Sequence, residues 1–219
     1  MDFYERLVSQ TEADQAKLRS APIITAALSG NVTRSLYLEF LCQAFHHVRH
    51  TVPLLMACGS RLPANMEFLR ESVTHYIEEE IGHDEWILND IRAIGGDADA
   101  VRQSAPAIET EVMVAYAYDL IFRQNPVGFF GMVFVLEGTS VELATRVAQS
   151  LGQHLNLPPS AFSYLSSHGS LDKQHIQDFR QLVNRLEKTE DQAAVIHAAK
   201  VFFRLYGDVI RSIGKEYVA

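Results

Sequence analysis

Hydrophobic residues recur at three- and four-residue spacing along nearly the whole chain. This is the period of an amphipathic helix, and no alternating β-branched runs bounded by hairpin turns compete with it. Gly and Pro residues divide the pattern, which predicts helices near residues 2–20, 33–58, 64–94, 106–124, 126–153, 159–186 and 190–217. No Gly-, Ser- or Pro-rich linker and no internal repeat separates them. We therefore expect an all-α fold, a single helical bundle of about seven helices over residues 1–219.

The composition is that of a folded domain that acts on a small molecule. With 219 residues, 47% of them hydrophobic, the chain can bury a sizeable core. Its net charge of −8 and its lack of a basic cluster argue against binding to nucleic acid or to an anionic membrane. A small-molecule partner is therefore expected.

The sequence also predicts a cellular location. Cys42 and Cys58 both lie in apolar, helix-like stretches, and the N-terminal sequence MDFYERLVSQTEADQ lacks the pattern of a signal peptide. We expect a cytoplasmic protein without disulfide bonds. The longest apolar stretch, from Pro126 to Leu136, is shorter than the roughly 20 residues needed to cross a bilayer, so we interpret it as a core helix.

A first candidate for metal chemistry is the acidic segment around His83. Residues three or four apart share a helix face, so Glu79 and Glu80 lie on either side of His83 and either carboxylate could join it on one ion. The alternative is a solvated acidic helix face with a surface histidine. This spacing alone does not separate the two interpretations.

A second candidate is Glu137, the one charged residue between Gln124 and Val141. A carboxylate buried in such apolar sequence costs several kcal/mol unless a cation, a metal or hydrogen bonds compensate it. Glu137 therefore needs a partner. The alternative to a metal is an ion pair with a buried Arg49 or Arg204.

The third candidate is the pattern H-x3-D-x2-H formed by His168, Asp172 and His175. At 100° per residue, these side chains point within about 60° of one another, so one helix can direct two imidazoles and a carboxylate to a common point. The alternative is a chance polar face. Of the three patterns, this one is the most specific.

Together the three patterns place three histidines and three carboxylates on three predicted helices. Mixed nitrogen and oxygen ligands suit iron or manganese, whereas structural zinc sites commonly include Cys. Helical bundles often build two-metal carboxylate sites from side chains that face the core. The conjunction therefore predicts a two-metal site inside the bundle.

These residues resemble the signature of the heme-oxygenase-like diiron oxidases, a family related in fold to TenA-type thiaminases. The signature is E-x2-H or E-x6-H, then a lone Glu, then H-x3-D-x2-H. Here Glu137 follows His83 by 54 residues, and His168 follows Glu137 by 31. At the E-x6-H position this chain has Tyr76, so Glu80 is chosen as ligand, with Glu79 kept open.

The resemblance implies an O2-dependent diiron oxidoreductase that oxidises a small organic molecule and forms a homodimer. The metals would be two Fe2+ ions, or iron with manganese at one site. Their ligands would be Glu80, His83, Glu137, His168, Asp172 and His175. Thiaminase is disfavoured because neither cysteine lies on the helix of Glu137, and heme oxygenase because residues 2–20 contain no histidine.

A histidine-rich segment precedes Pro53, which should kink or interrupt the second predicted helix. We expect His47 and His50 to line a substrate pocket together with Phe134. Two alternatives to the diiron enzyme remain. One is a metal-independent TenA-like or quinone-cofactor-biosynthesis-like enzyme in which His46, His47 and His50 act as acid and base, and the other is a non-enzymatic partner-binding protein.

Overall fold

The computed structural model describes residues 1–214, and for residues 168–175 it describes the backbone alone. All regular elements within these residues are helical, which confirms the predicted all-α class. Eleven are α-helices: α1 (Phe3–Arg19), α2 (Pro22–Leu28), α3 (Arg34–Val48), α4 (Thr51–Arg61), α5 (Glu67–Glu80), α6 (His83–Ala93), α7 (Ala98–Gln103), α8 (Ile108–Arg123), α9 (Phe130–Leu155), α10 (Ser163–Val183) and α11 (Thr189–Ser212). Three short 3-10 helices join them: η1 (Ala64–Met66), η2 (Pro126–Phe129) and η3 (Pro159–Ala161).

The predicted number of about seven helices is wrong, for two reasons. The predicted helices 33–58 and 64–94 are each divided in two, and the short α2 and α7 were not predicted. The first division, at Arg49 and His50, places Pro53 in the first turn of α4. Proline is tolerated there because the amide N–H groups of a first turn have no partner within the helix.

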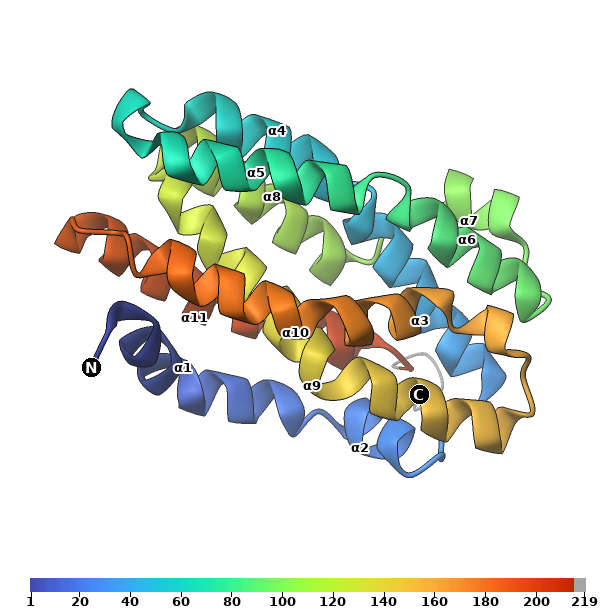
Figure 1. Ribbon diagram of the computed structural model, residues 1–219. Coiled ribbons are helices and arrows are strands. Elements are labelled where there is room, and N and C mark those ends of the chain that lie inside the picture. Colours follow the sequence, from blue (N-terminus) through green and yellow to red (C-terminus); the bar gives the residue numbers. More distant parts are fainter. Residues whose placement is uncertain (215–219) are drawn as a thin grey trace.

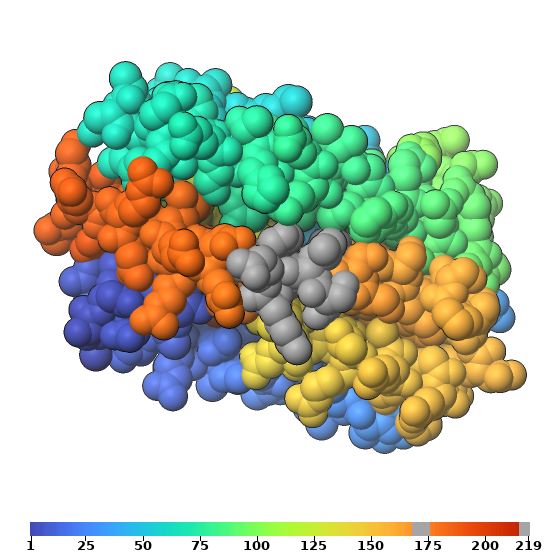
Figure 2. Space-filling model, in the orientation of Figure 1, coloured from blue at the N-terminus to red at the C-terminus, as the bar shows by residue number. Residues whose placement is uncertain are grey.

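The long helix α9 lies at the centre of the bundle, packed against α10, α11 and α2. In Figure 1, α4 and α5 run along one side of the molecule and α1 and α2 along the opposite side, with α9, α10 and α11 between them. Figure 2 shows the same order on the surface, with α5 and α6 in green above and α1 and α2 in blue below. The segment Pro126–Leu155 is long and apolar enough to cross a membrane by length and composition, a test that core helices also pass.

Gly131 allows α9 and α11 to approach closely. A Cβ atom on Gly131 would lie 2.6 Å from the Val195 carbonyl oxygen and 2.7 Å from the Ala199 amide nitrogen. Three contacts between this segment and α11 follow one another in the same direction along both helices. Gly128 in η2 lies against Ala194, Gly131 against Ala198, and Phe134 against Phe203. The two helices are therefore parallel here, with a register that continues toward Glu137 on α9 and Tyr206 on α11.

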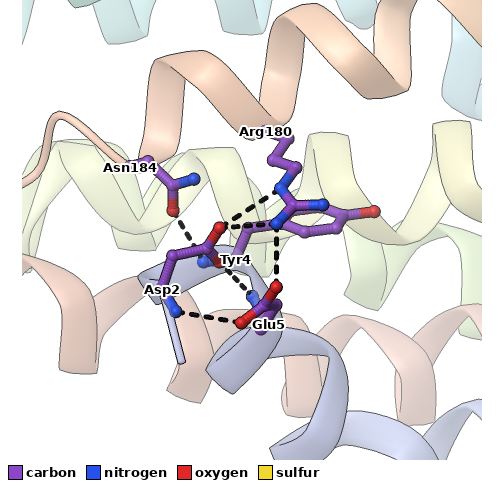
Figure 3. Close-up of polar contacts among 5 residues, drawn as sticks. All are labelled: Asp2, Tyr4, Glu5, Arg180 and Asn184. Carbon is purple, nitrogen blue, oxygen red and sulfur yellow. Dashed lines mark hydrogen bonds and ion pairs between the residues drawn. The ribbon is translucent and has the colours of Figure 1, made fainter.

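The N-terminal helix is fixed to the second half of α10 (Figure 3). Asp2 caps α1, and its carboxylate also accepts a hydrogen bond of 2.6 Å from Arg180, which binds Glu5 at 2.9 Å as well. The Tyr4 amide donates to the Asn184 side-chain oxygen at 2.9 Å. The backbone hydrogen bond from Glu5, followed by the Arg180 contact, lowers the pKa of Asp2.

Candidate metal centre

Glu80 and His83 lie at a break between two helices. α5 ends at Glu80, and Gly82 adopts a left-handed conformation with φ of +91° immediately before α6 begins at His83. The prediction that both residues share one long helix is wrong. They are nevertheless brought together, because the turn places His83 Nδ1 2.9 Å from a Glu80 carboxylate oxygen.

His83 is well placed to act as a ligand. Its side chain is only 4% exposed, and its ring packs on Trp86 with 4.2 Å between the ring centroids. A carboxylate that binds one ring nitrogen fixes the tautomer and the orientation of the imidazole. Since Glu80 binds Nδ1, Nε2 is the nitrogen that His83 can offer to a metal.

Tyr76 marks the place where three helices bring their carboxylates together. It is buried on α5, and burial raises the pKa of its hydroxyl well above the usual value. The negative charges of Glu137 on α9, of Glu79 and Glu80 on α5, and of Asp178 on α10 raise this pKa further. The Tyr76 hydroxyl is therefore protonated near neutral pH, among carboxylates from α5, α9 and α10.

Glu137 is half-buried on α9, where the sequence pattern indicated burial on every face. It lines a cavity that Glu80 and Tyr76 also line. Neither arginine considered as its ion-pair partner is buried: Arg204 is exposed and pairs with Asp208, and Arg49 is exposed over the ring of Phe45. The structure therefore gives no support to a buried arginine as the compensating charge.

The remaining predicted ligands, His168, Asp172 and His175, lie on α10, and their side chains are outside the described residues. α10 packs against α5, α6 and α9, the helices that carry the other three. Among the residues whose side chains are described, no three His, Cys, Asp or Glu residues form a metal site by themselves. A complete site thus depends on α10.

Asp90, which sequence reasoning missed, fixes the start of α10 to α6. It is fully buried, and its carboxylate accepts hydrogen bonds from the Ser163 and Tyr164 backbone amides, each at 3.0 Å, and from the Ser163 hydroxyl. Burial raises the pKa of Asp90, and these hydrogen bonds oppose the rise. A charged residue between Leu88 and Ile91, on the buried face of α6, was the signal in the sequence.

The cavity has a volume of about 190 Å3 and lies between the two clusters of core residues. Its lining follows one face of α9 from Met132 to Leu151 and is largely apolar. Of the two Glu residues considered as ligands beside His83, Glu80 lines the cavity and Glu79 does not. Glu79 instead contacts His75 at 3.2 Å, so the geometry favours Glu80.

The side chains of His46, His47 and His50 lie in three different environments. His47 lines the cavity, as expected. His46 binds the Ser104 hydroxyl at 2.9 Å and His50 binds the Tyr118 hydroxyl at 3.2 Å, and neither lines the cavity. Phe134 is not part of the lining either, because it packs against the aromatic rings of Tyr4, Phe179 and Phe203.

The donors that are described fit iron. Glu80, Glu137 and His83 offer oxygen and nitrogen donors, a set that iron and manganese accept. Four carboxylates on three helices raise the pKa of Tyr76, and concentrated negative charge of this kind is what divalent cations compensate. The described residues thus place carboxylates from two helices at the wall of a largely apolar cavity, with the buried His83 bonded to one of them.

Comparison with known proteins agrees with this chemistry. A family model described as iron-containing redox enzyme matches residues 38–207. No curated protein sequence matches the chain. Many solved structures share its fold, and the three described next are each less than 25% identical to it.

A heme-oxygenase-like domain of unknown function from Shewanella denitrificans has a TM-score of 0.87 and 24% identity, and the match covers 100% of this chain and 94% of that one. A TenA homologue from Pseudomonas syringae has a TM-score of 0.79 and 11% identity over 96% and 91% of the two chains. A CADD-like protein of unknown function from Nostoc punctiforme has a TM-score of 0.76 and 14% identity over 98% and 100%. The chain belongs to the iron-containing redox enzyme family and has the heme-oxygenase-like fold.

Proposed function

We propose that this protein is an O2-dependent oxidase or oxygenase that oxidises a small organic molecule at a non-heme site of two iron ions, one of which can be replaced by manganese. The ligands would be Glu80, His83, Glu137, His168, Asp172 and His175. The observation that carries the proposal is that Glu80, bonded to the buried His83, and Glu137 from a different helix line one cavity. The match to an iron-containing redox family supports it.

In this proposal the metal ions supply the electrons and the open coordination positions that O2 activation requires. The protein supplies three further functions. Glu80 orients the His83 ring, and Tyr76 offers a neutral hydroxyl that can donate a hydrogen bond to a neighbouring carboxylate. The largely apolar cavity holds the substrate beside Glu137 and keeps out water that would consume a reactive oxidant.

Metal analysis tests the proposal directly. Protein purified after iron supplementation, and handled without oxygen, should contain about two metal ions per chain. A variant that combines Glu137→Ala with His168→Ala should lose them. The matched control is Glu142→Ala, because Glu142 lies on the same helix, is half-exposed, pairs with Arg19 and does not line the cavity. Wild-type protein that binds no metal at micromolar Fe2+ would overturn the proposal.

The metal-independent alternative required His46, His47 and His50 to act together on one substrate. The structure separates them, since only His47 lines the cavity. No observation therefore favours that acid and base group. A partner-binding protein without enzyme activity would leave unexplained the cavity beside Glu80 and Glu137.

Three accompanying proposals follow the sequence analysis. We propose that the protein is cytoplasmic, that it forms a homodimer, and that its partners are the organic substrate and O2 rather than nucleic acid or a membrane. Sedimentation of the full chain at micromolar concentration tests the homodimer. A single species with the mass of one 24.6 kDa chain would contradict it.

A further inference from the structure

The lining of the cavity includes a polar side chain to which the proposed chemistry gives no role. Tyr206 on α11 lines the cavity together with Ile210 and Ile213, which follow it at helical spacing. The parallel register of α9 and α11, fixed by Gly131 against Ala198 and by Phe134 against Phe203, continues to Tyr206. Since Tyr206 is three residues beyond Phe203, and Glu137 three beyond Phe134, the two residues stand at the same level of the cavity.

The Tyr206 hydroxyl is available for a ligand. Its ring packs edge-to-face on His47, with 5.9 Å between the ring centroids. Among the described residues, no group forms a hydrogen bond with its hydroxyl, and burial raises the pKa of Tyr206 to about 12. It is therefore a protonated donor at neutral pH, beside a histidine that lines the same cavity.

Two other hydroxyl groups of the lining form hydrogen bonds within the protein. Tyr37 donates to the Ala161 carbonyl at 2.8 Å, and Thr139 donates to the Val135 carbonyl at 2.6 Å. Neither hydroxyl hydrogen is free for a ligand in this arrangement. This contrast distinguishes Tyr206 from them.

The charged side chains that the structure describes in the lining do not favour an anionic ligand. Glu80 and Glu137 are its charged residues, and among the described residues it contains neither Lys nor Arg. A buried carboxylate or phosphate needs a cation or several donors to offset its lost hydration. Without metal, such a group would instead meet two carboxylates of its own sign.

The shape of the cavity indicates an extended ligand. Its lining follows α9 from Met132 to Leu151, a length of about 28 Å at the 1.5 Å rise of an α-helix. The apolar residues along this path include Leu136, Leu143 and Val147. A volume of about 190 Å3 spread over such a length forms a narrow space, which an alkyl chain fills better than a compact ring system.

We propose that the cavity binds a neutral, elongated apolar molecule with one uncharged oxygen-containing head group, such as an alcohol or an aldehyde, which accepts a hydrogen bond from the Tyr206 hydroxyl at the level of Glu137. This inference deepens the proposed function, because it names the substrate class of the same site. It assigns Tyr206 as a specificity-determining residue. The apolar chain would extend along the α9 face of the cavity.

The test compares three ligands of equal chain length, 1-decanol, decane and decanoate, by calorimetric titration of the full chain, both as purified and after metal chelation. In the chelated protein, 1-decanol should bind about tenfold more tightly than decane, the worth of one hydrogen bond, and decanoate should bind most weakly. Tyr206→Phe should remove most of the preference for 1-decanol over decane. The matched control is Tyr116→Phe, which removes another buried hydroxyl beside α11 but outside the cavity and should keep the preference.

Two results would overturn the inference. One is decanoate binding to chelated protein as tightly as 1-decanol, and the other is an unchanged preference for 1-decanol in Tyr206→Phe. Tight decanoate binding that appears only with metal would also overturn it, since the head group would then bind the ions. Binding to chelated protein does not require metal, so failure of the diiron proposal and failure of this inference are distinguishable.

Discussion

The contact between α9 and α11 at Gly131 sets the width of the bundle at its centre, and Gly131→Ala measures that constraint. The added methyl group would lie 2.6 Å from the Val195 carbonyl oxygen and 2.7 Å from the Ala199 amide nitrogen. Both are backbone atoms of a buried helix, so neither can move as a flexible side chain would. Overpacking of this kind costs about 1–3 kcal/mol or more, partly offset by about 1 kcal/mol from the better helix propensity of alanine.

The expected net result is a loss of about 2 kcal/mol in the free energy of unfolding, which corresponds to a Tm lower by about 4–8 °C in a chain of this size. Urea denaturation of chelated protein, followed by circular dichroism, measures it. Gly138→Ala is the control on the same helix, because a Cβ there meets nothing within 4 Å. Alanine at 138 should stabilise the protein by about 0.5–1 kcal/mol. Equal effects of the two substitutions would refute the packing argument.

Three further predictions concern the elements around the proposed site. Asp90→Ala removes the carboxylate that holds the start of α10 and should cost about 2 kcal/mol in urea denaturation, whereas a neutral result would show that this cap does not order α10. Gly82→Ala forces a left-handed alanine at φ of +91° and should cost about 1–2 kcal/mol, with no clash to add to it. Burial, followed by the charges of Arg49 and His50, lowers the pKa of His46 below 6.5. Because the folded state binds this proton less well, stability from His46 is complete above pH 6.5 and is lost as the pH falls through the lowered pKa. His46→Gln should therefore flatten the acid side of the stability curve, and an unchanged slope would contradict this.

Much of the fold could be predicted because the three- and four-residue period of apolar positions directly reports helices. The strongest predictions correspond to α1, α8, α9, α10 and α11, whose bounds lie within a few residues of those expected. The interruption expected near Pro53 lies about three residues earlier, at His50. The division at Gly82 was not predicted, since a break that preserves the apolar phase leaves little trace in the period. The short α2 and α7 were missed because fewer than eight residues carry too little of the pattern.

The site was predictable where its residues stand out from their neighbours. Glu137 was visible as one charge in apolar sequence, and the structure places it at the cavity with Glu80. Tyr206 was not singled out from the sequence, because a tyrosine that packs and one that offers its hydroxyl to a cavity have the same spacing. His50 and Phe134 show the converse: their spacing fitted a pocket, but their side chains turn to Tyr118 and to other aromatic rings. Rotamers and neighbours decide such cases, and neither is encoded in a periodic pattern.

The left-handed residue at Gly82 makes the junction of α5 and α6 a joint between two separately hydrogen-bonded helices. A metal bound by Glu80 at the end of α5 and by His83 at the start of α6 would hold these two helices together. Ligands from α10 would attach a third helix to them. Metal binding would then reduce local unfolding of these helices, in addition to supplying reactivity. Amide hydrogen exchange should slow on both sides of Gly82 when iron is added. Exchange in α8, which packs against α11, η2, α4 and α3, should stay the same.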